Sequence, residues 1–178
     1  LAEALTTNNT LVTLVLCFNN IGSEGASNIA NSLIMNQTLV SLDIRGNRID
    51  ATGARAMSEA LKVNRTLTCL DIRSNNINSV GIISLAEALT VNNTLTSLEI
   101  RGNPNIDALG AIALARSMVV NQTIASLDLD LYNIGASDAH VLAECLLVAN
   151  HSLTDLSLRG NCLGSEGATA LAGALMVN

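Results

Sequence analysis

Hydrophobic positions recur along this chain with a period of 28 or 29 residues. The pattern Leu-x-x-Leu-x-Leu-x-x-Asn-x-Leu begins at Leu11, Leu39, Leu67, Leu95, Ile124 and Leu153. Self-similarity at a fixed period of this length is typical of architectures that stack one small unit on the next. The sequence therefore predicts six copies of one unit, preceded by a partial copy at residues 1–8.

Each copy contains two kinds of hydrophobic periodicity. In its first part, apolar residues alternate with polar ones, as at Leu42 and Ile44, which predicts a short strand with one buried face. In its second part they recur every four residues, as at Met57 and Leu61, which predicts a helix of about three turns. An Asn follows each helix, at Asn8, Asn36, Asn64, Asn92, Asn121, Asn150 and Asn178. Since Asn tolerates left-handed backbone, we expect it to close the helix in that conformation.

This combination of strand, Asn and helix resembles the leucine-rich repeat family, in particular its ribonuclease-inhibitor-like class with 28- or 29-residue repeats. The resemblance covers essentially the whole chain. It implies an α/β fold, a right-handed solenoid shaped like a horseshoe, with a parallel β-sheet on the concave face and α-helices on the convex face. It also implies a ladder of Asn side chains that satisfies backbone groups between strand and helix. That position is held by Asn19, Asn47, Asn75, Asn103 and Asn161.

The two ends suggest a piece of a larger assembly. Residues 1–178 read as a single array, in which Leu1 to Asn8 match the last turns of a helix. Neither end shows the polar capping unit that keeps a solenoid soluble. We therefore expect either a fragment of a longer chain or self-association through the uncapped ends.

Composition narrows the classes of partner. The net charge is -6 without a Lys/Arg run, which argues against nucleic acid. No apolar run approaches the roughly 20 residues of a membrane span. The cysteines Cys17, Cys69, Cys145 and Cys162 form neither a disulfide framework nor a metal-binding pair, which favours a reducing, cytoplasmic setting.

The Asn residues at the joints between copies allow a different localisation. Each of the six from Asn8 to Asn150 begins an Asn-x-Ser/Thr sequence, a glycan acceptor in secreted proteins. We favour a structural explanation, in which Asn ends the helix and Ser or Thr enters the next strand. Glycosylation would instead indicate a secreted or cell-surface protein.

Two charged stripes are predicted on the inner face of the sheet. The central strand position reads Val15, Asp43, Asp71, Glu99, Asp128 and Ser157, and the next inner position reads Cys17, Arg45, Arg73, Arg101, Asp130 and Arg159. One explanation is a solvated face whose opposite charges compensate each other across strands. The other is a surface that orients a protein ligand, because complementary charge supplies specificity and association rate.

The stripes are interrupted in two copies. The residue after the strand is Gly or Ser in most copies, but it is Phe18 in the first and Leu131 in the fifth. Tyr132 replaces the ladder Asn of the fifth copy, and Phe18 and Tyr132 are the only aromatic residues. Aromatic residues are favoured anchors at interfaces. Alternatively, Phe18 covers an edge and Tyr132 fills the ladder position with its own hydrogen bond.

One-residue insertions mark the same region. One introduces Pro104, the only proline, into the loop of the fourth copy, and the other lengthens the fifth helix before Asn150. The fourth and fifth copies therefore depart most from the common pattern.

Residues suited to catalysis are scarce. His140 and His151 have no nucleophile or metal ligand at a suitable spacing, and the recurring glycines form no phosphate-binding loop. We expect no cofactor, no metal and no enzymatic activity. The predicted function is a protein-protein interaction module that acts as inhibitor, scaffold or sensor. The alternatives are a GTPase-activating protein of the Ran-activating type and a structural or adhesive surface protein.

Overall fold

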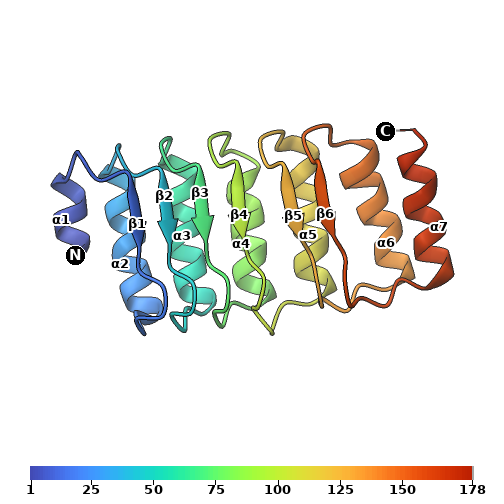
Figure 1. Cartoon of the computed structure of the whole chain (residues 1–178), viewed down its shortest axis with the longest axis horizontal. Helices are drawn as coiled ribbons and strands as arrows, with labels where there is room; N and C mark the ends of the chain where they lie inside the picture. Colours follow the sequence, from blue (N-terminus) through green and yellow to red (C-terminus); the bar gives the residue numbers. More distant parts are fainter. Residues whose placement is uncertain (178) are drawn as a thin grey trace.

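The computed structural model describes residues 1–177, so the helix end predicted at Asn178 lies outside the described residues. Short strands alternate with helices along the chain (Figure 1). The strands are β1 (Thr13–Val15), β2 (Ser41–Asp43), β3 (Cys69–Asp71), β4 (Ser97–Glu99), β5 (Ser126–Asp128) and β6 (Asp155–Ser157). The helices are α1 (Ala2–Thr7), α2 (Gly22–Met35), α3 (Ala51–Val63), α4 (Ser79–Leu89), α5 (Ala108–Val120), α6 (Ala136–Leu142) with the π-helical η1 (Ala143–Val148), and α7 (Gly164–Leu175).

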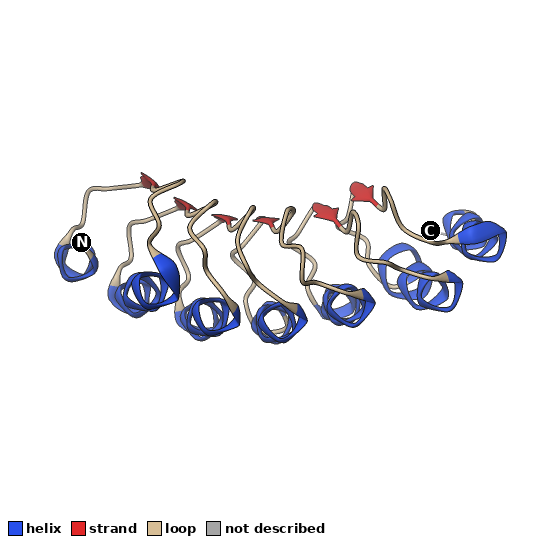
Figure 2. Cartoon of the chain, turned by 90° about the horizontal axis from the view of Figure 1, so that it is seen from below, coloured by secondary structure: helices blue, strands red, loops and turns tan. Residues whose placement is uncertain are grey.

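Strands and helices form two curved layers. Figure 2 shows the strands along the inner side of the arc and the helices along its outer side. Neighbouring strands within a sheet are parallel and in unshifted register, so that Leu14 pairs with Leu42 and Leu42 pairs with Leu70. The α/β solenoid with an inner parallel sheet, predicted from the sequence, is therefore confirmed.

The core lies between the two layers. The middle residue of each inner strand, such as Leu42, is buried, whereas its two neighbours face the inner surface. Met57 and Leu61 meet it from the helical layer and are also buried. Each fully buried side chain of this size stabilises the fold by about 1.5–3 kcal/mol. One repeat cannot bury its apolar face alone, so the copies stabilise one another.

Two helix starts are tied to the preceding copy. The Asp50 carboxylate accepts hydrogen bonds from the first backbone amides of α3 and from Ser23 Oγ, at 2.5 Å. The hydrogen bond from Ser23 is the main cause that lowers the pKa of Asp50. Asp107 and Ser79 repeat this arrangement at α5, and the Ser79 hydroxyl lowers the pKa of Asp107.

The prediction that the joint Asn residues adopt left-handed backbone is wrong. Asn36 follows α2 with φ −73° and ψ 129°, which is extended backbone, and Asn64 is also extended. Their role is side-chain hydrogen bonding between copies. Asn64 Nδ2 donates to the carbonyls of Leu33 and Asn36, and its Oδ1 accepts from the amides of Thr66 and Leu67.

This arrangement recurs along the array as a joint ladder, formed by Asn36, Asn64, Asn92, Asn121 and Asn150. All five side chains are buried, so a glycan on Nδ2 is incompatible with this packing. Asn8 precedes the first rung and is exposed.

The insertion in the fifth helix is accommodated without shifting the next copy. In η1 a backbone hydrogen bond reaches five residues back instead of four: the Ala149 amide donates to the Glu144 carbonyl. A π-helical turn is the usual result of a single inserted residue. Over residues 1–177, no helix is long and apolar enough to cross a membrane.

Candidate protein-binding surface

The Asn residues between strand and helix form a second ladder, called here the turn ladder. Asn47 Oδ1 accepts from the amides of Asn19 and Ile21, and its Nδ2 donates to the carbonyls of Leu16 and Ile44. Asn75, Asn103 and Asn161 also bridge two copies. Asn19 differs from its predicted role, because its side chain is exposed and donates only to Cys17 of its own turn.

Tyr132 takes the turn-ladder position of the fifth copy. Its side chain is only 3% exposed, and its hydroxyl lies 3.5 Å from the Ile100 carbonyl. Asn75 donates to the equivalent carbonyl, that of Ile44. The Tyr132 hydroxyl thus replaces the donating Nδ2 of an Asn, but nothing in the Tyr side chain replaces the accepting Oδ1. Burial, and secondarily the nearby Asp128 and Asp130, raises the pKa of Tyr132 well above its usual value.

The predicted role of Tyr132 as a surface anchor is corrected by this burial. Asp130 is buried as well, where it accepts hydrogen bonds from Ser157 Oγ and the Arg159 amide. These two predicted site residues therefore shape the surface from beneath.

The sheet is interrupted beside Tyr132, between the fourth and fifth copies. Strands β1–β4 form one sheet, and β5–β6 form another. Ile44 and Ile72 each donate a backbone hydrogen bond to the next strand, whereas Ile100 and Gly102 donate none within residues 1–177. The joint ladder still crosses this gap through Asn121. We call the gap the seam.

The predicted charged stripes lie side by side on the inner face. Arg73 and Asp71 form a close pair, with Arg73 Nη2 2.6 Å from Asp71 Oδ2. Arg45 lies between Asp43 and Asp71, at 3.4 Å and 4.0 Å. The hydrogen bond that the Arg73 guanidinium donates to the Asp71 carboxylate is the main cause that raises the pKa of Arg73. The carboxylates therefore order the guanidinium groups.

The stripe changes at the seam. Arg101 lies 4.0 Å from both Asp128 and Asp130, outside hydrogen-bonding distance. Glu99 is half-buried, and Arg159 is exposed beyond the seam. At the other end, Val15 is exposed and Cys17 is half-buried. The predicted residues share one face, but the ordered ion pairs are concentrated in β2 and β3.

The residues that follow the strands form a row along one rim of the sheet. This rim row consists of Phe18, Gly46, Ser74, Gly102, Leu131 and Gly160, and all six have a positive φ between 53° and 76°. Large apolar side chains occupy two of these glycine-like positions. Phe18 and Leu131 are each 69% exposed, and each lies over the glycine of the following copy, Gly46 and Gly160.

Two adjacent hollows lie between Phe18 and Leu131. The first, of about 310 Å³, is lined by Phe18, Arg45, Arg73, Ser74, Arg101 and Gly102. The second, of about 350 Å³, is lined by Arg101, Gly102, Asn103, Pro104, Asp130, Leu131 and Tyr132. Both are lined by Arg101 and Gly102, so they adjoin each other, and we call them together the rim trough. The sequence pointed to Phe18 and Leu131, but not to the hollow between them.

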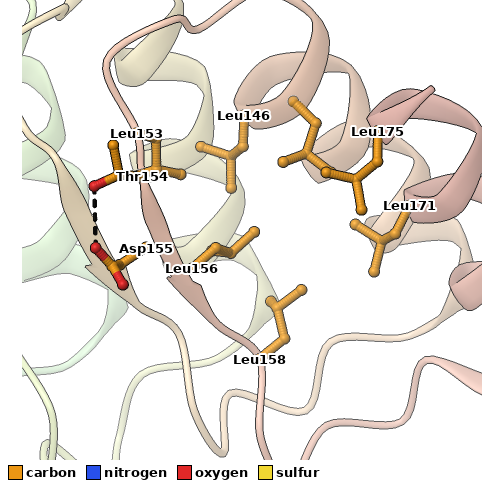
Figure 3. A pocket seen from close by; sticks show the side chains of 9 residues that line it. Leu146, Leu153, Thr154, Asp155, Leu156, Leu158, Leu171 and Leu175 are labelled. Carbon is orange, nitrogen blue, oxygen red and sulfur yellow. Dashed lines mark hydrogen bonds between the residues drawn. The ribbon is translucent and has the colours of Figure 1, made fainter. Parts of the chain in front are cut away.

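A larger hollow of about 450 Å³ opens at the end of the array. It lies between β6 and α7, and leucines from both elements point into it (Figure 3). Leu156, Leu158 and Leu175 are among these residues. Elsewhere in the chain the equivalent face is covered by the next copy. No residue type marks this hollow, because the equivalent leucines are buried in the inner copies.

Short parallel strands, outer helices and two Asn ladders define a leucine-rich repeat solenoid. A family model described as "Leucine Rich repeat" matches residues 7–30, 36–58, 63–86, 91–115 and 149–172, more than half of the chain. The chain therefore belongs to the leucine-rich repeat family. The matched segments leave out residues 116–148, which include Tyr132 and η1.

No curated protein matches the sequence. Among solved structures, the chain is similar to one described as leiomodin-1 actin-binding site 2, with 21% identity and a TM-score of 0.61 over 98% of this chain and 85% of that chain. It is also similar to a tropomodulin C-terminal domain from Caenorhabditis elegans, with 11% identity and a TM-score of 0.66 over 98% and 89% of the chains. These similarities concern the fold.

Proposed function

We propose that this chain is a non-catalytic module that binds a protein partner through its concave face and rim, as an inhibitor, scaffold or sensor. One observation carries the proposal: the inner face bears ion-paired side chains, yet no other part of residues 1–177 covers it (Figure 2). Exposed ion pairs contribute only about 0–1 kcal/mol to folding. The fixed arrangement of these ion-paired side chains is better explained by recognition, in which complementary charge selects and orients a partner.

The experiment compares matched variants on the two faces. One variant combines Val15→Glu with Glu99→Lys on the concave face, and its control combines Val80→Glu with Glu87→Lys on α4. Within residues 1–177, none of these four side chains forms an ion pair or a hydrogen bond that the substitution would remove, so both variants are expected to fold. Each immobilised protein captures partners from cells that express the parent chain.

A partner that binds the parent and the α4 variant, but not the concave variant, supports the proposal. Equal capture by all three proteins, or loss only in the α4 variant, contradicts binding through the concave face. Actin belongs among the purified proteins tested directly, because leiomodin-1 actin-binding site 2 has this fold. Purified actin tests one named partner without a lysate.

The two alternative functions have their own tests. A GTPase-activating protein would accelerate GTP hydrolysis by a Ran-type GTPase, whereas a binding module would leave the rate unchanged. We propose a cytoplasmic setting, because five joint Asn residues are buried in hydrogen bonds. An adhesive glycoprotein would instead carry glycans at these residues, which a mass measurement on natively expressed protein detects.

A further inference from the structure

We propose that the rim trough binds an extended acidic segment of the partner, with an apolar residue at each end of that segment. This inference rests on the proposed function, because it assigns the chemistry that the partner presents. Three features carry it. Phe18 and Leu131 form two apolar walls of the trough, the backbone at Ser74 and Gly102 forms an open floor, and arginines lie along one side.

The two wall residues have a backbone conformation that is unfavourable for their residue types. Phe18 and Leu131 have φ values of 59° and 65°, where side chains other than glycine are unfavourable. At Gly46, Gly102 and Gly160 the same turn is made without this conflict. Because most of each side chain is exposed, burial in this chain does not explain the choice. A backbone outlier of this kind suggests function, and exposed apolar side chains over glycines suit a partner's apolar residues.

The floor between the walls is low and has a free donor. Ser74 and Gly102 carry small or no side chains there, whereas Gly46 lies beneath Phe18. The amides of Gly46 and Ser74 donate to the next copy, at Arg73 and Arg101. The Gly102 amide donates no hydrogen bond within residues 1–177, because the seam interrupts the series. The floor can therefore meet a peptide closely and donate a hydrogen bond to it.

The exposed charge beside the floor is positive. The side chains of Arg45, Arg73 and Arg101 are 37%, 37% and 50% exposed. The carboxylates near them are less exposed, at 16% for Asp43, 13% for Asp71, 26% for Asp128 and 4% for Asp130. Arg45 Nε is buried and lies 3.4 Å from Asp43 Oδ2, in an ion pair without a hydrogen bond. Guanidinium groups held in this way favour carboxylates, which they bind in a planar, charge-assisted geometry.

The spacing of the walls fixes the length of the segment. Phe18 and Leu131 lie four copies apart, which is roughly 20 Å when the unpaired step at the seam is given the same spacing as the three paired steps. An extended chain rises by about 3.3 Å per residue, so seven residues span this distance. Alternate side chains share a face, which places the first, third, fifth and seventh residues toward the trough. The peptide Leu-Ser-Glu-Ser-Glu-Ser-Leu satisfies both conditions.

This peptide, blocked at both ends and fluorescently labelled, is the probe for a binding titration with the whole chain. We expect Gln in place of both Glu residues to weaken binding about tenfold. We expect Arg101→Gln to weaken it about tenfold as well, and Phe18→Gly or Leu131→Gly about fivefold each. Glycine suits the positive φ at both positions, so these two variants should fold. Arg55→Gln, an exposed arginine on α3, is the matched control and should bind like the parent.

Three outcomes overturn the inference: no binding of the peptide, binding that none of the three rim variants weakens, or equal displacement by inorganic phosphate. The last outcome would make the arginines a general anion site. If concave-face variants lose a captured partner but the peptide neither binds nor competes with it, this inference fails while the proposed function stands. If no partner depends on the concave face, the proposed function fails and the inference fails with it.

Discussion

At the scale of single residues, Tyr132 shows how one side chain both continues and interrupts a ladder. Its hydroxyl reaches the Ile100 carbonyl, as an Asn side chain does in other copies. Its ring offers no acceptor to the backbone of the fourth copy, which an Asn Oδ1 would provide. Below about pH 10 the phenol is neutral in both the folded and the unfolded chain. Ionisation in the folded chain is opposed by burial and by two nearby carboxylates.

Alkaline pH should therefore destabilise the fold through Tyr132. Above about pH 10 the unfolded chain releases the phenolic proton while the folded chain keeps it. The unfolded state then binds fewer protons, so the free energy of unfolding falls, by up to about 1.4 kcal/mol per pH unit. Urea unfolding from about pH 9 to about pH 11 measures this slope. Because Tyr132 is the only Tyr and there is no Trp, phenolate absorbance reports its ionisation directly.

Tyr132→Phe is the control for this titration. Loss of the hydroxyl should lower stability at neutral pH by about 0.5–1.5 kcal/mol. The variant should lack the additional alkaline loss that the parent shows. An ordinary phenolate titration in the folded parent would contradict the burial of Tyr132.

The joint ladder allows a second comparison between equivalent residues. Asn64→Ala removes four side-chain hydrogen bonds to backbone groups from a buried position. We expect a loss of about 2–4 kcal/mol in the free energy of unfolding, because buried partners are left unsatisfied. Asn8→Ala removes only acceptance from Thr10 and Leu11 at an exposed site, so its expected loss is about 1 kcal/mol or less. Equal urea midpoints for the two variants would show that the buried joint ladder does not stabilise the fold more than the exposed Asn8 does.

At the scale of elements, the seam divides the sheet but not the joint ladder. Amide hydrogen exchange should detect this difference. The amides of Ile72 and Ser74 donate to the next strand, whereas those of Ile100 and Gly102 have no such acceptor within residues 1–177. We expect Ile100 and Gly102 to exchange faster than Ile72 and Ser74 in the folded protein. Uniform protection across the four amides would show that β4 and β5 are joined as the other strands are.

The sequence predicted the repeated elements well because their causes are local. Alternation at Leu42 and Ile44, followed by four-residue spacing at Met57 and Leu61, gave strand and helix in the observed order. The conformation of Asn64 could not be read in this way, because its hydrogen bonds go to the preceding copy. The sequence pattern explained each joint Asn by helix termination. In the structure, these residues instead form hydrogen bonds between copies.

The candidate surface was predicted only in part, for a related reason. The stripes and the exposed Phe18 and Leu131 follow from position in the repeat. Whether Tyr132 points outward or inward depends on packing between the fourth and fifth copies, which no single repeat specifies. The free amide of Gly102 likewise results from a bond that is not formed, and no residue type signals it.

At the scale of the whole molecule, the hollow beside β6 and α7 exposes apolar side chains at the end of the array. Leu156, Leu158 and Leu175 line a space that the next copy fills elsewhere in the array (Figure 3). Burial of such apolar surface is worth about 25 cal/mol per Å², which favours contact between open ends. We therefore predict that the polypeptide of residues 1–178 self-associates reversibly, and that this association strengthens with protein concentration.

Light scattering across a dilution series measures this association as native mass. A charge placed in the hollow by Leu175→Glu should lower the mass toward that of one chain, because contact would bury an unpaired carboxylate. Leu109→Glu, an equally exposed leucine on α5, should leave the mass unchanged. If both variants lower it alike, association depends on general apolar exposure. If the parent keeps the mass of one chain at every concentration, the open end does not pair with a second copy, and the prediction is wrong.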